Sequence, residues 1–323
     1  MNPYPSSAEL FDPKNAPADI VAFNEKLRAS TIEAPARWEY DLAVERAAGS
    51  HSAGVLPAVP LSDRAINRAI PGPGGEIPLR VITPQGGKVE GIYVHFHGGG
   101  FTYGSASGQD VMLQDIADNA RAVSISVDYR LAPEHPYPAG PADCEAATWW
   151  AIREASREFG TDRIVLGGES AGATLAVLVA LRLRDRRHFS GLAGLNLAHG
   201  AYDLSMTPSM RAAQETLILT RPTLERMLKG YLPDIAHDDP AVSPLYARLN
   251  GLPRALFTVG TGDPLLDDSL FMHGRWLAAG NAAELDVTPC AVHAFNLLPI
   301  ETAADTNGRI ERFILECFRA GRQ

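Results

Sequence analysis

From about residue 64 onward, short apolar strand patterns alternate with helix patterns, and this alternation constrains the fold more than any other feature of the chain. Eight strands are predicted, at residues 65–70, 77–83, 91–97, 122–129, 163–168, 191–198, 254–262 and 283–289. The sequence PGPGG separates the first two and indicates a hairpin. Helix patterns separate most of the others, which favours a mostly parallel eight-stranded sheet with helices on both faces. The predicted fold class is therefore α/β.

Helical periodicity between the strands covers residues 107–122, 141–159 and 171–187. The helix after the seventh strand is expected to bury one face, formed by Leu266, Leu270, His273 and Leu277. The final helix carries an apolar stripe that should pack on the sheet, formed by Ile310, Phe313, Ile314, Cys317 and Phe318.

Two regions lie outside the alternation. Residues 1–60 are interrupted by prolines and contain helical patches at 18–28 and 38–46, and residues 201–245 are helical in character. We therefore divide the chain into an N-terminal segment at 1–60, a sheet-forming domain at 61–200 and 246–323, and an inserted segment at 201–245. In such domains the chemistry lies where the parallel strands end, so residues that directly follow strands are the candidates for a functional site.

The charge balance argues against nucleic acid or an anionic membrane as a partner. The 323 residues carry a formal net charge of −9, with a sequence pI near 5.5, whereas both of those partners need basic clusters. One arginine-rich run, at 182–187, is interpreted as the solvated end of a helix. Small molecules therefore remain as the expected partners.

Cysteine and histidine spacing gives no indication of a metal or a disulfide framework. Cys144, Cys290 and Cys317 are three in number and far apart, and His95 and His97 have no third ligand in view. We interpret these two histidines as ordering the core or a loop. Walker A, GxGxxG and HExxH motifs are absent, so we expect neither a cofactor nor a metal.

The N-terminus lacks the basic and apolar segments of a signal peptide. No apolar run approaches the roughly 20 residues that a membrane span needs. Together with the cysteine usage, this predicts a cytoplasmic protein without membrane contact.

Residues 168–172 read Gly-Glu-Ser-Ala-Gly, a G-x-S-x-G motif. A strand pattern precedes the motif and a helix pattern follows it, the context in which such a motif presents a nucleophilic serine on a sharp turn. Small neighbours are needed there because the serine adopts a strained backbone conformation. Ser170 is the candidate nucleophile, and the alternative is a serine that merely caps a glycine-rich helix start.

Three successive glycines, at 98–100, follow the third strand. Glycines let the backbone approach a ligand closely and direct N–H groups at it. Acyl transfer needs such donors where negative charge develops on the carbonyl oxygen. We assign this role to the N–H groups of Gly98, Gly99 and Ala171, and the alternative is a flexible glycine turn.

A nucleophilic serine also needs an imidazole base and a carboxylate that orients it, in the chain order serine, acid, histidine. His293 follows the eighth strand and is the candidate base, and His199, after the sixth strand, is its rival. Asp263 directly follows the seventh strand and is the candidate acid. Asp267 and Asp268 begin the next helix, where capping is their expected role.

In combination these motifs resemble the hormone-sensitive-lipase-like (bacterial family IV) carboxylesterases of the α/β-hydrolase superfamily. The resemblance spans about residues 90–300 and rests on HGGGF at 97–101, DYRLAPEHPYPAG at 128–140, GESAG at 168–172, DPLLDD at 263–268 and HAF at 293–295. It implies the α/β-hydrolase fold with a helical cap, built from 1–60 and 201–245 over the catalytic domain. It also implies Ser170, Asp263 and His293 as the catalytic triad.

The same resemblance implies a serine carboxylesterase that acts on short to medium acyl esters through an acyl-enzyme, and such enzymes often pair as homodimers through an edge strand. The family often has Asp where this chain has Glu169, so the role of Glu169 stays open. The stretch at 128–140 is interpreted as a supporting loop network through Arg130 and Glu134.

Other functions of the same machinery remain open. A lactonase, an amidase or a deacetylase would use the same triad, and a small-ligand binding protein could use the same fold. Five residues beside the motifs are candidates for the substrate pocket, although each could equally be core: Phe101, Tyr103, Tyr202, Leu204 and Phe295.

Overall fold

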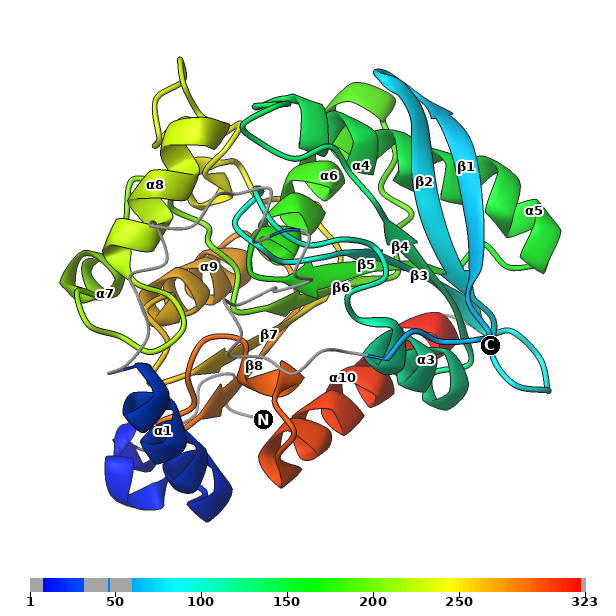
Figure 1. Ribbon diagram of the computed structural model, residues 1–323. Helices are drawn as coiled ribbons and strands as arrows, with labels where there is room; N and C mark the ends of the chain where they lie inside the picture. The colour runs from blue at the N-terminus through cyan, green and yellow to red at the C-terminus, as the bar shows by residue number, and fades with distance from the viewer. Residues whose placement is uncertain (1–7, 32–45, 47–59, 321–323) are drawn as a thin grey trace.

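The computed structural model describes residues 8–31, 46 and 60–320 of the chain. Its centre is an eight-stranded sheet with the strand order β1-β2-β4-β3-β5-β6-β7-β8 (Figure 1). The strands are β1 (Ile66–Gly72), β2 (Gly75–Ile82), β3 (Gly91–Phe96), β4 (Ala122–Val127), β5 (Ile164–Glu169), β6 (Gly194–Ala198), β7 (Ala255–Gly260) and β8 (Ala283–Thr288). All eight predicted strands are therefore present.

The sheet is mostly parallel. β1 and β2 form the predicted hairpin, which closes at Gly72 opposite Gly75, and β2 lies antiparallel to β4. Every pairing from β4 to β8 is parallel. The carboxyl ends of β3, β5, β6, β7 and β8 therefore lie along one edge of the sheet.

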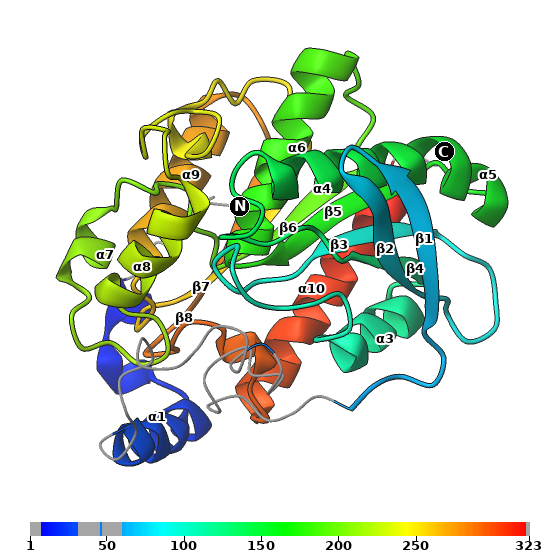
Figure 2. The same ribbon diagram turned by 45° about the horizontal axis from the view of Figure 1, so that its top comes forward.

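Helices cover both faces of the sheet (Figures 1 and 2). α4 (Ala139–Trp150), α6 (Ala171–Arg187) and α9 (Leu266–Ala278) contribute to one core cluster, and α3 (Asp110–Asn119) and α10 (Glu301–Arg319) contribute to the other. A π-helical turn (Ala151–Ala155) and α5 (Ser156–Phe159) continue α4, so the helix predicted at 141–159 is one nearly continuous rod in three segments. No helix in the described part of the chain is long and apolar enough to cross a bilayer.

The buried faces of α9 and α10 were predicted with different success. All five residues of the α10 stripe are buried, as the periodicity indicates. In α9 the prediction was only partly right: His273 is buried as expected, whereas Leu266, Leu270 and Leu277 are half-buried. The other buried residues are Asp268, Ser269, Met272 and Trp276. The buried face is shifted by about one position from the predicted one, because polar residues in its first turn bind the inserted segment and Trp276 fills the core.

The inserted segment contains α7 (Pro208–Ala212), α8 (Arg221–Tyr231) and the short 3-10 turn Pro244–Tyr246. Its two ends are joined: the Leu245 N–H donates to the Tyr202 carbonyl at 3.0 Å, and the Leu204 N–H donates to Ser243 Oγ at 2.7 Å. The insertion therefore leaves and re-enters the sheet domain at nearly the same place.

Two acidic residues of α9 attach the insertion to the sheet domain. Asp268 accepts the Tyr202 N–H at 2.7 Å and the Thr207 hydroxyl at 2.7 Å, and Asp267 accepts the Ser209 N–H at 2.8 Å. The expectation that both merely cap a helix was therefore incomplete, since they bind a separate segment.

The N-terminal helix α1 (Ala18–Thr31) covers the predicted patch at 18–28. Its Ile20 and Leu27 pack with Val292 and Phe295, and Asn24 donates to the Cys290 carbonyl at 2.9 Å. α1 therefore supports the loop after β8. Of the other predicted patch, 38–46, only Arg46 lies within the described residues.

Candidate active site

The strand ends bring the candidate residues of the G-x-S-x-G motif, the acid and the base together. Ser170 directly follows β5, Asp263 lies three residues after the end of β7, and His293 lies five residues after the end of β8. His293 Nδ1 is 2.9 Å from Asp263 Oδ2, and His293 Nε2 is 3.0 Å from Ser170 Oγ. The three side chains thus form one hydrogen-bonded line.

This line has a defined direction of donation. A carboxylate only accepts, so Nδ1 of His293 carries the proton, and its Nε2 lone pair faces the Ser170 hydroxyl. Asp263 also accepts the Leu265 N–H at 2.8 Å through its other oxygen, which fixes the plane of the carboxylate. Asp263 and His293 are 3% and 6% exposed, so little water competes for these bonds. The arrangement can remove a proton from the serine.

Ser170 stands in a strained turn between β5 and α6, with φ 55° and ψ −120°. The turn is tight: a Cβ on Gly172 would lie 1.8 Å from the Phe96 carbonyl oxygen, so only glycine fits there. The Ser170 N–H donates to the Ala198 carbonyl at 2.9 Å. The turn therefore holds the Ser170 side chain out at the edge of the sheet, next to the start of α6.

The glycine loop after β3 lies against the same turn. An ideal Cβ on Gly98 would be 3.0 Å from the Glu169 carbonyl oxygen and 3.5 Å from Ser170 Cβ. Gly99 has φ +112°, and a Cβ there would meet the Tyr103 carbonyl at 2.3 Å, so the loop cannot carry a side chain at this position. Gly98, Gly99 and Ala171 all line the cavity beside Ser170. Their backbones can thus approach a bound carbonyl group.

Two histidines beside this loop are structural, as their spacing without a third ligand indicates. His97 Nδ1 donates to the Gly98 carbonyl at 2.8 Å, and its ring stacks on Tyr129 at 4.2 Å. His95 lies between Ser126 Oγ and Glu169 Oε2, at 2.9 Å from each. Glu169 is 2% exposed, and its bond to His95 ties β5 to β3 directly beside Ser170.

The DYRLAPEHPYPAG stretch is a loop network, although Arg130 and Glu134 bind different partners. Arg130 makes a bidentate pair with Asp143 at 2.8 and 2.9 Å. Glu134 accepts from Arg46 at 2.8 Å, and Arg46 also donates to the Thr102 carbonyl at 2.9 Å. The N-terminal segment is therefore bonded to the loop that follows the three glycines.

The cavity beside Ser170 has a volume of about 80 Å³. Its walls are mostly apolar, and the inserted segment contributes several of them. The lining residues beyond Ser170, His293 and the glycine loop are Phe101, Gln109, Glu169, Ala171, His199, Ala201, Ile218, Leu219, Leu224, Met227, Leu265, Ala294 and Leu297.

Of the five residues proposed for a substrate pocket, only Phe101 lines this cavity. Tyr202 and Leu204 are fully buried in the main core, and Tyr103 is 5% exposed. Phe295 is fully buried beneath α1, with Val292 and Leu298. The four belong to the packing around the site, because adjacency to a motif does not decide which way a side chain points.

Sequence reasoning missed the walls that come from the insertion. A signal for them exists in α8, where Leu224, Met227, Leu228 and Tyr231 are spaced i, i+3, i+4 and i+7 and are all buried. Phe101 stacks on Tyr231 at 4.0 Å, which joins this face to the glycine loop. The apolar stripe of α8 thus predicts a helix that lies over the site.

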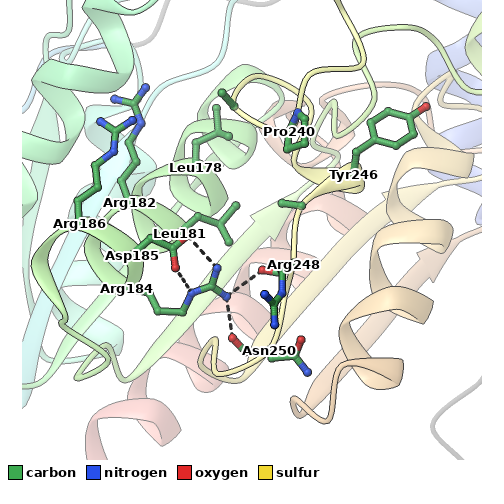
Figure 3. Close-up of a pocket in the computed structure, with 12 residues that line it drawn as sticks. Leu178, Leu181, Arg182, Arg184, Asp185, Arg186, Pro240, Tyr246, Arg248 and Asn250 are labelled. Carbon is green, nitrogen blue, oxygen red and sulfur yellow. Dashed lines mark hydrogen bonds and ion pairs between the residues drawn. The ribbon is translucent and has the colours of Figure 1, made fainter.

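A larger cavity, of about 710 Å³, lies elsewhere in the described structure, between the end of α6 and residues 240–250 (Figure 3). Arg184 crosses it, donating to both Asp185 oxygens and to the carbonyls of Arg248 and Asn250. The arginine run was interpreted as a solvated helix end, and this interpretation was incomplete. Arg184 holds the chain that leads into β7. Neither serine, threonine, cysteine nor histidine is among the residues that line this cavity, so the smaller one is the candidate site.

Three possible metal ligands lie close together in the site. One ligand atom each from His199, Asp263 and His293 lies within 4.8 Å of the others. Both nitrogens of His293 and both oxygens of Asp263 are already hydrogen-bonded, so a metal there would replace some of these bonds. We interpret the group as a hydrogen-bonded network.

The sequence profile of the alpha/beta hydrolase fold matches residues 93–297 of the chain. The carboxylic ester hydrolase LipN of Mycobacterium tuberculosis is 35% identical to the chain over 279 residues, which are 83% of this chain and 74% of LipN.

Solved esterase structures share the whole architecture. A hyperthermophilic esterase from the archaeon Pyrobaculum calidifontis superposes with a TM-score of 0.81 at 28% identity, over 91% of this chain and 97% of that one. A hormone-sensitive lipase from a metagenome library superposes with a TM-score of 0.80 at 28% identity, over 95% and 99% of the two chains. The similarity therefore extends beyond the motifs.

Proposed function

The chain belongs to the hormone-sensitive-lipase-like branch of the α/β-hydrolase family and is a carboxylic ester hydrolase, and we propose that Ser170, Asp263 and His293 carry out its reaction. The observation that carries this proposal is the position of His293, hydrogen-bonded to Asp263 at 2.9 Å and to Ser170 at 3.0 Å. Its substrates are small-molecule esters.

In the first step, Ser170 Oγ attacks the ester carbonyl while His293 Nε2 takes the hydroxyl proton. Asp263 stabilises the resulting imidazolium and keeps the Nδ1 proton directed at its own Oδ2. The carbonyl oxygen becomes an oxyanion, and the N–H groups of Gly98, Gly99 and Ala171 donate to it. His293 then gives its proton to the leaving alcohol, and the serine is left acylated.

In the second step, water attacks the acyl-enzyme. His293 takes a proton from this water and returns it to Ser170 Oγ as the carboxylate product leaves. The low exposure of His293 supports a site that bulk water reaches only to a limited extent.

We propose that residues 1–60 and 201–245 form a cap over this site, on the catalytic domain at 61–200 and 246–323. Ile218, Leu219, Leu224 and Met227 of the insertion contribute apolar walls of the cavity. Its volume of about 80 Å³ is roughly half that of an apolar cavity that accepts benzene. This supports acyl groups of a few carbons, at the short end of the short to medium range.

We also propose a cytoplasmic homodimer that pairs through an edge strand. Cys144, Cys290 and Cys317 are free thiols, which suits a reducing compartment. β8 is an edge of the sheet, and the first four residues of this strand are not fully buried. Cell fractionation and light scattering on the purified protein test the two statements.

The experiment that tests the proposed activity is a panel of p-nitrophenyl esters from acetate to laurate, with matched lactones and anilides. Turnover of short esters, lost when Ser170 is blocked by an organophosphate, is expected. Faster turnover of a lactone or anilide than of every ester would contradict an ester as the preferred substrate.

A further inference from the structure

His199 is a histidine at the active site to which the proposed reaction gives no role. It follows β6 directly, lines the cavity beside Ser170 and is fully buried. Its backbone φ is 37°, in the left-handed region that non-glycine residues rarely adopt. Its N–H donates to the Thr258 carbonyl at 2.7 Å, which holds this conformation between β6 and β7.

The ring of His199 lies against the ring of His293. The two ring centroids are 4.7 Å apart, with the ring planes at 70° to each other. The bonds of His293 to Asp263 and Ser170 lie in its ring plane and do not by themselves prevent the ring from tilting out of that plane. A neighbouring ring at this distance and angle supplies a lateral contact that opposes the tilt.

His199 is itself held by Asn296. Its Nε2 is 2.8 Å from Asn296 Oδ1, and since an amide oxygen only accepts, Nε2 carries the proton. Asn307 in turn donates to the backbone carbonyl of Asn296 at 2.9 Å. Nδ1 of His199 is buried and has no hydrogen-bond partner among the described residues. The His199 side chain is thus fixed by a hydrogen bond at Nε2, while Nδ1 makes none with the described residues.

Burial is the main reason why His199 is neutral. Burial, and to a smaller extent the nearby His293, lower the pKa of His199 to about 4, although Asp263, the hydrogen bond to Asn296 and Glu169 act in the opposite direction. A neutral ring tolerates the positive charge that His293 gains during the reaction, and a protonated one would repel it. His199 also has no hydrogen bond to Ser170, so it is not placed to act as the base.

We propose that His199 is a positioning residue for His293: a neutral ring, fixed by Asn296, that keeps the His293 imidazole in line between Asp263 and Ser170. This inference rests on the proposed function, in which His293 is the base. It gives a role to the residue that sequence reasoning treated only as a rival base.

Two substitutions at His199 test the contact. His199→Ala removes the ring and should lower kcat by about 10- to 100-fold with KM nearly unchanged, because misplacement of a catalytic group by about 1 Å costs up to roughly 100-fold. His199→Phe keeps a neutral ring and should retain most of kcat. His273→Phe is the matched control, a buried histidine of α9 that does not line the cavity, and it should leave kcat unchanged.

A third variant tests the charge state, which a purely structural role would not affect. Asn296→Asp puts a carboxylate on the Nε2 proton of His199 and so favours a protonated His199 beside His293. Because a protonated His199 opposes the positive charge that His293 gains during the reaction, activity then requires both histidines to be neutral. The acidic limb of the kcat/KM profile should therefore move to higher pH. The double variant Asn296→Asp with His199→Phe should show no such movement.

The outcomes separate this inference from the proposed function. Full kcat in His199→Ala, with Ser170→Ala inactive, would overturn the inference alone. Equal kcat losses in His199→Ala and His199→Phe, together with an unmoved acidic limb in Asn296→Asp, would also overturn it. If His199→Ala does not fold, His199→Phe and Asn296→Asp decide between these outcomes. Activity in Ser170→Ala would overturn both proposals.

Discussion

Ser170 combines two demands that oppose each other. Its backbone, with φ 55° and ψ −120°, lies in a region that costs a non-glycine residue on the order of 1–3 kcal/mol. The same conformation holds the hydroxyl 3.0 Å from His293 Nε2. Stability is therefore given up at the residue that we propose as the nucleophile.

The first prediction follows from this conflict. Ser170→Ala should lower kcat by about 10⁶-fold, as loss of a triad nucleophile does elsewhere, while the melting temperature stays within a few degrees. Ser170→Gly should be equally inactive and melt higher, since glycine adopts this backbone without strain. Steady-state kinetics and calorimetry check both, and organophosphate labelling of wild type should modify Ser170 alone. A labelled serine elsewhere would contradict the assignment.

A second prediction concerns the orienting carboxylate. Asp263→Asn should lower kcat by about 10⁴-fold, because an amide in place of Oδ2 favours the wrong tautomer of His293. Asp267→Asn is the matched control: it lies four residues away and binds the Ser209 N–H, so kcat should change little. Kinetics on the two purified variants compare them. Equal losses would mean that the acid has not been identified.

At this scale the sequence predicted which three candidate residues would lie together, but not the walls of the cavity beside them. Ser170, Asp263 and His293 could be found because strand ends in a parallel sheet converge, whatever the loops do. Tyr202 and Phe295 could not be placed from the sequence, because a shift of one position along a loop decides whether a side chain points into the core or into the cavity. Ile218 and Met227 come from a segment whose position over the sheet depends on long-range packing.

At the scale of secondary-structure elements, α9 connects the insertion to the sheet. Asp268 is fully buried, and burial raises the pKa of its carboxyl to about 7, although hydrogen bonds from Thr207, Tyr202 and Asp203 oppose the rise. Its proton is bound more tightly in the folded state than in the unfolded one. The contribution of Asp268 to stability is therefore complete below about pH 4 and is lost as the pH rises through about 7.

The third prediction follows from this pH dependence of the stabilisation by Asp268. Asp268→Asn cannot titrate, so the free energy of unfolding of wild type relative to the variant should fall as the pH rises from about 5 to 8, by an amount on the order of a few kcal/mol. Urea titrations at several pH values measure the difference. Parallel stability curves for the two proteins would show that this carboxyl has its ordinary pKa in the folded state.

The helix α1 gives a fourth prediction. It packs on Val292 and bonds to Cys290, so removing residues 1–40 should loosen the loop that carries His293. Ester turnover should fall by about 10-fold or more, while a small organophosphate still modifies Ser170, though more slowly. A truncated protein with unchanged turnover and an unchanged chain-length profile would show that the N-terminal segment takes no part in the cap.

Element boundaries were predicted more accurately than element faces. All eight strands and the helix at 171–187 were found, because apolar runs and breakers are local properties of the chain. The buried face of α9 was found only at His273, since Asp268 and Ser269 are buried for their bonds and packing rather than for apolar character. A hydrophobic pattern cannot reveal a buried acid whose partners lie about 60 residues away.

At the scale of the whole molecule, the proposed cap should limit which substrates react. The cavity of about 80 Å³ should make kcat/KM rise with acyl length by roughly 0.8 kcal/mol per methylene and fall once the pocket is full, at about four carbons. Met227→Ala removes one wall and should move the optimum toward longer esters. Arg186→Ala, in the larger cavity, is the control and should not. An optimum that stays unchanged in Met227→Ala would place the acyl group elsewhere.

The joined ends of the insertion also affect how such an enzyme can change over time. Because the Tyr202 carbonyl binds the Leu245 N–H and the Leu204 N–H binds Ser243, the chain between them forms a closed unit on a fixed base. Mutations, insertions or whole replacements inside that unit can alter the walls of the pocket while the strand ends that carry the triad stay in place. Substrate preference and catalytic power are thus free to evolve separately, and recombination between related esterases at these two points should yield folded chimaeras.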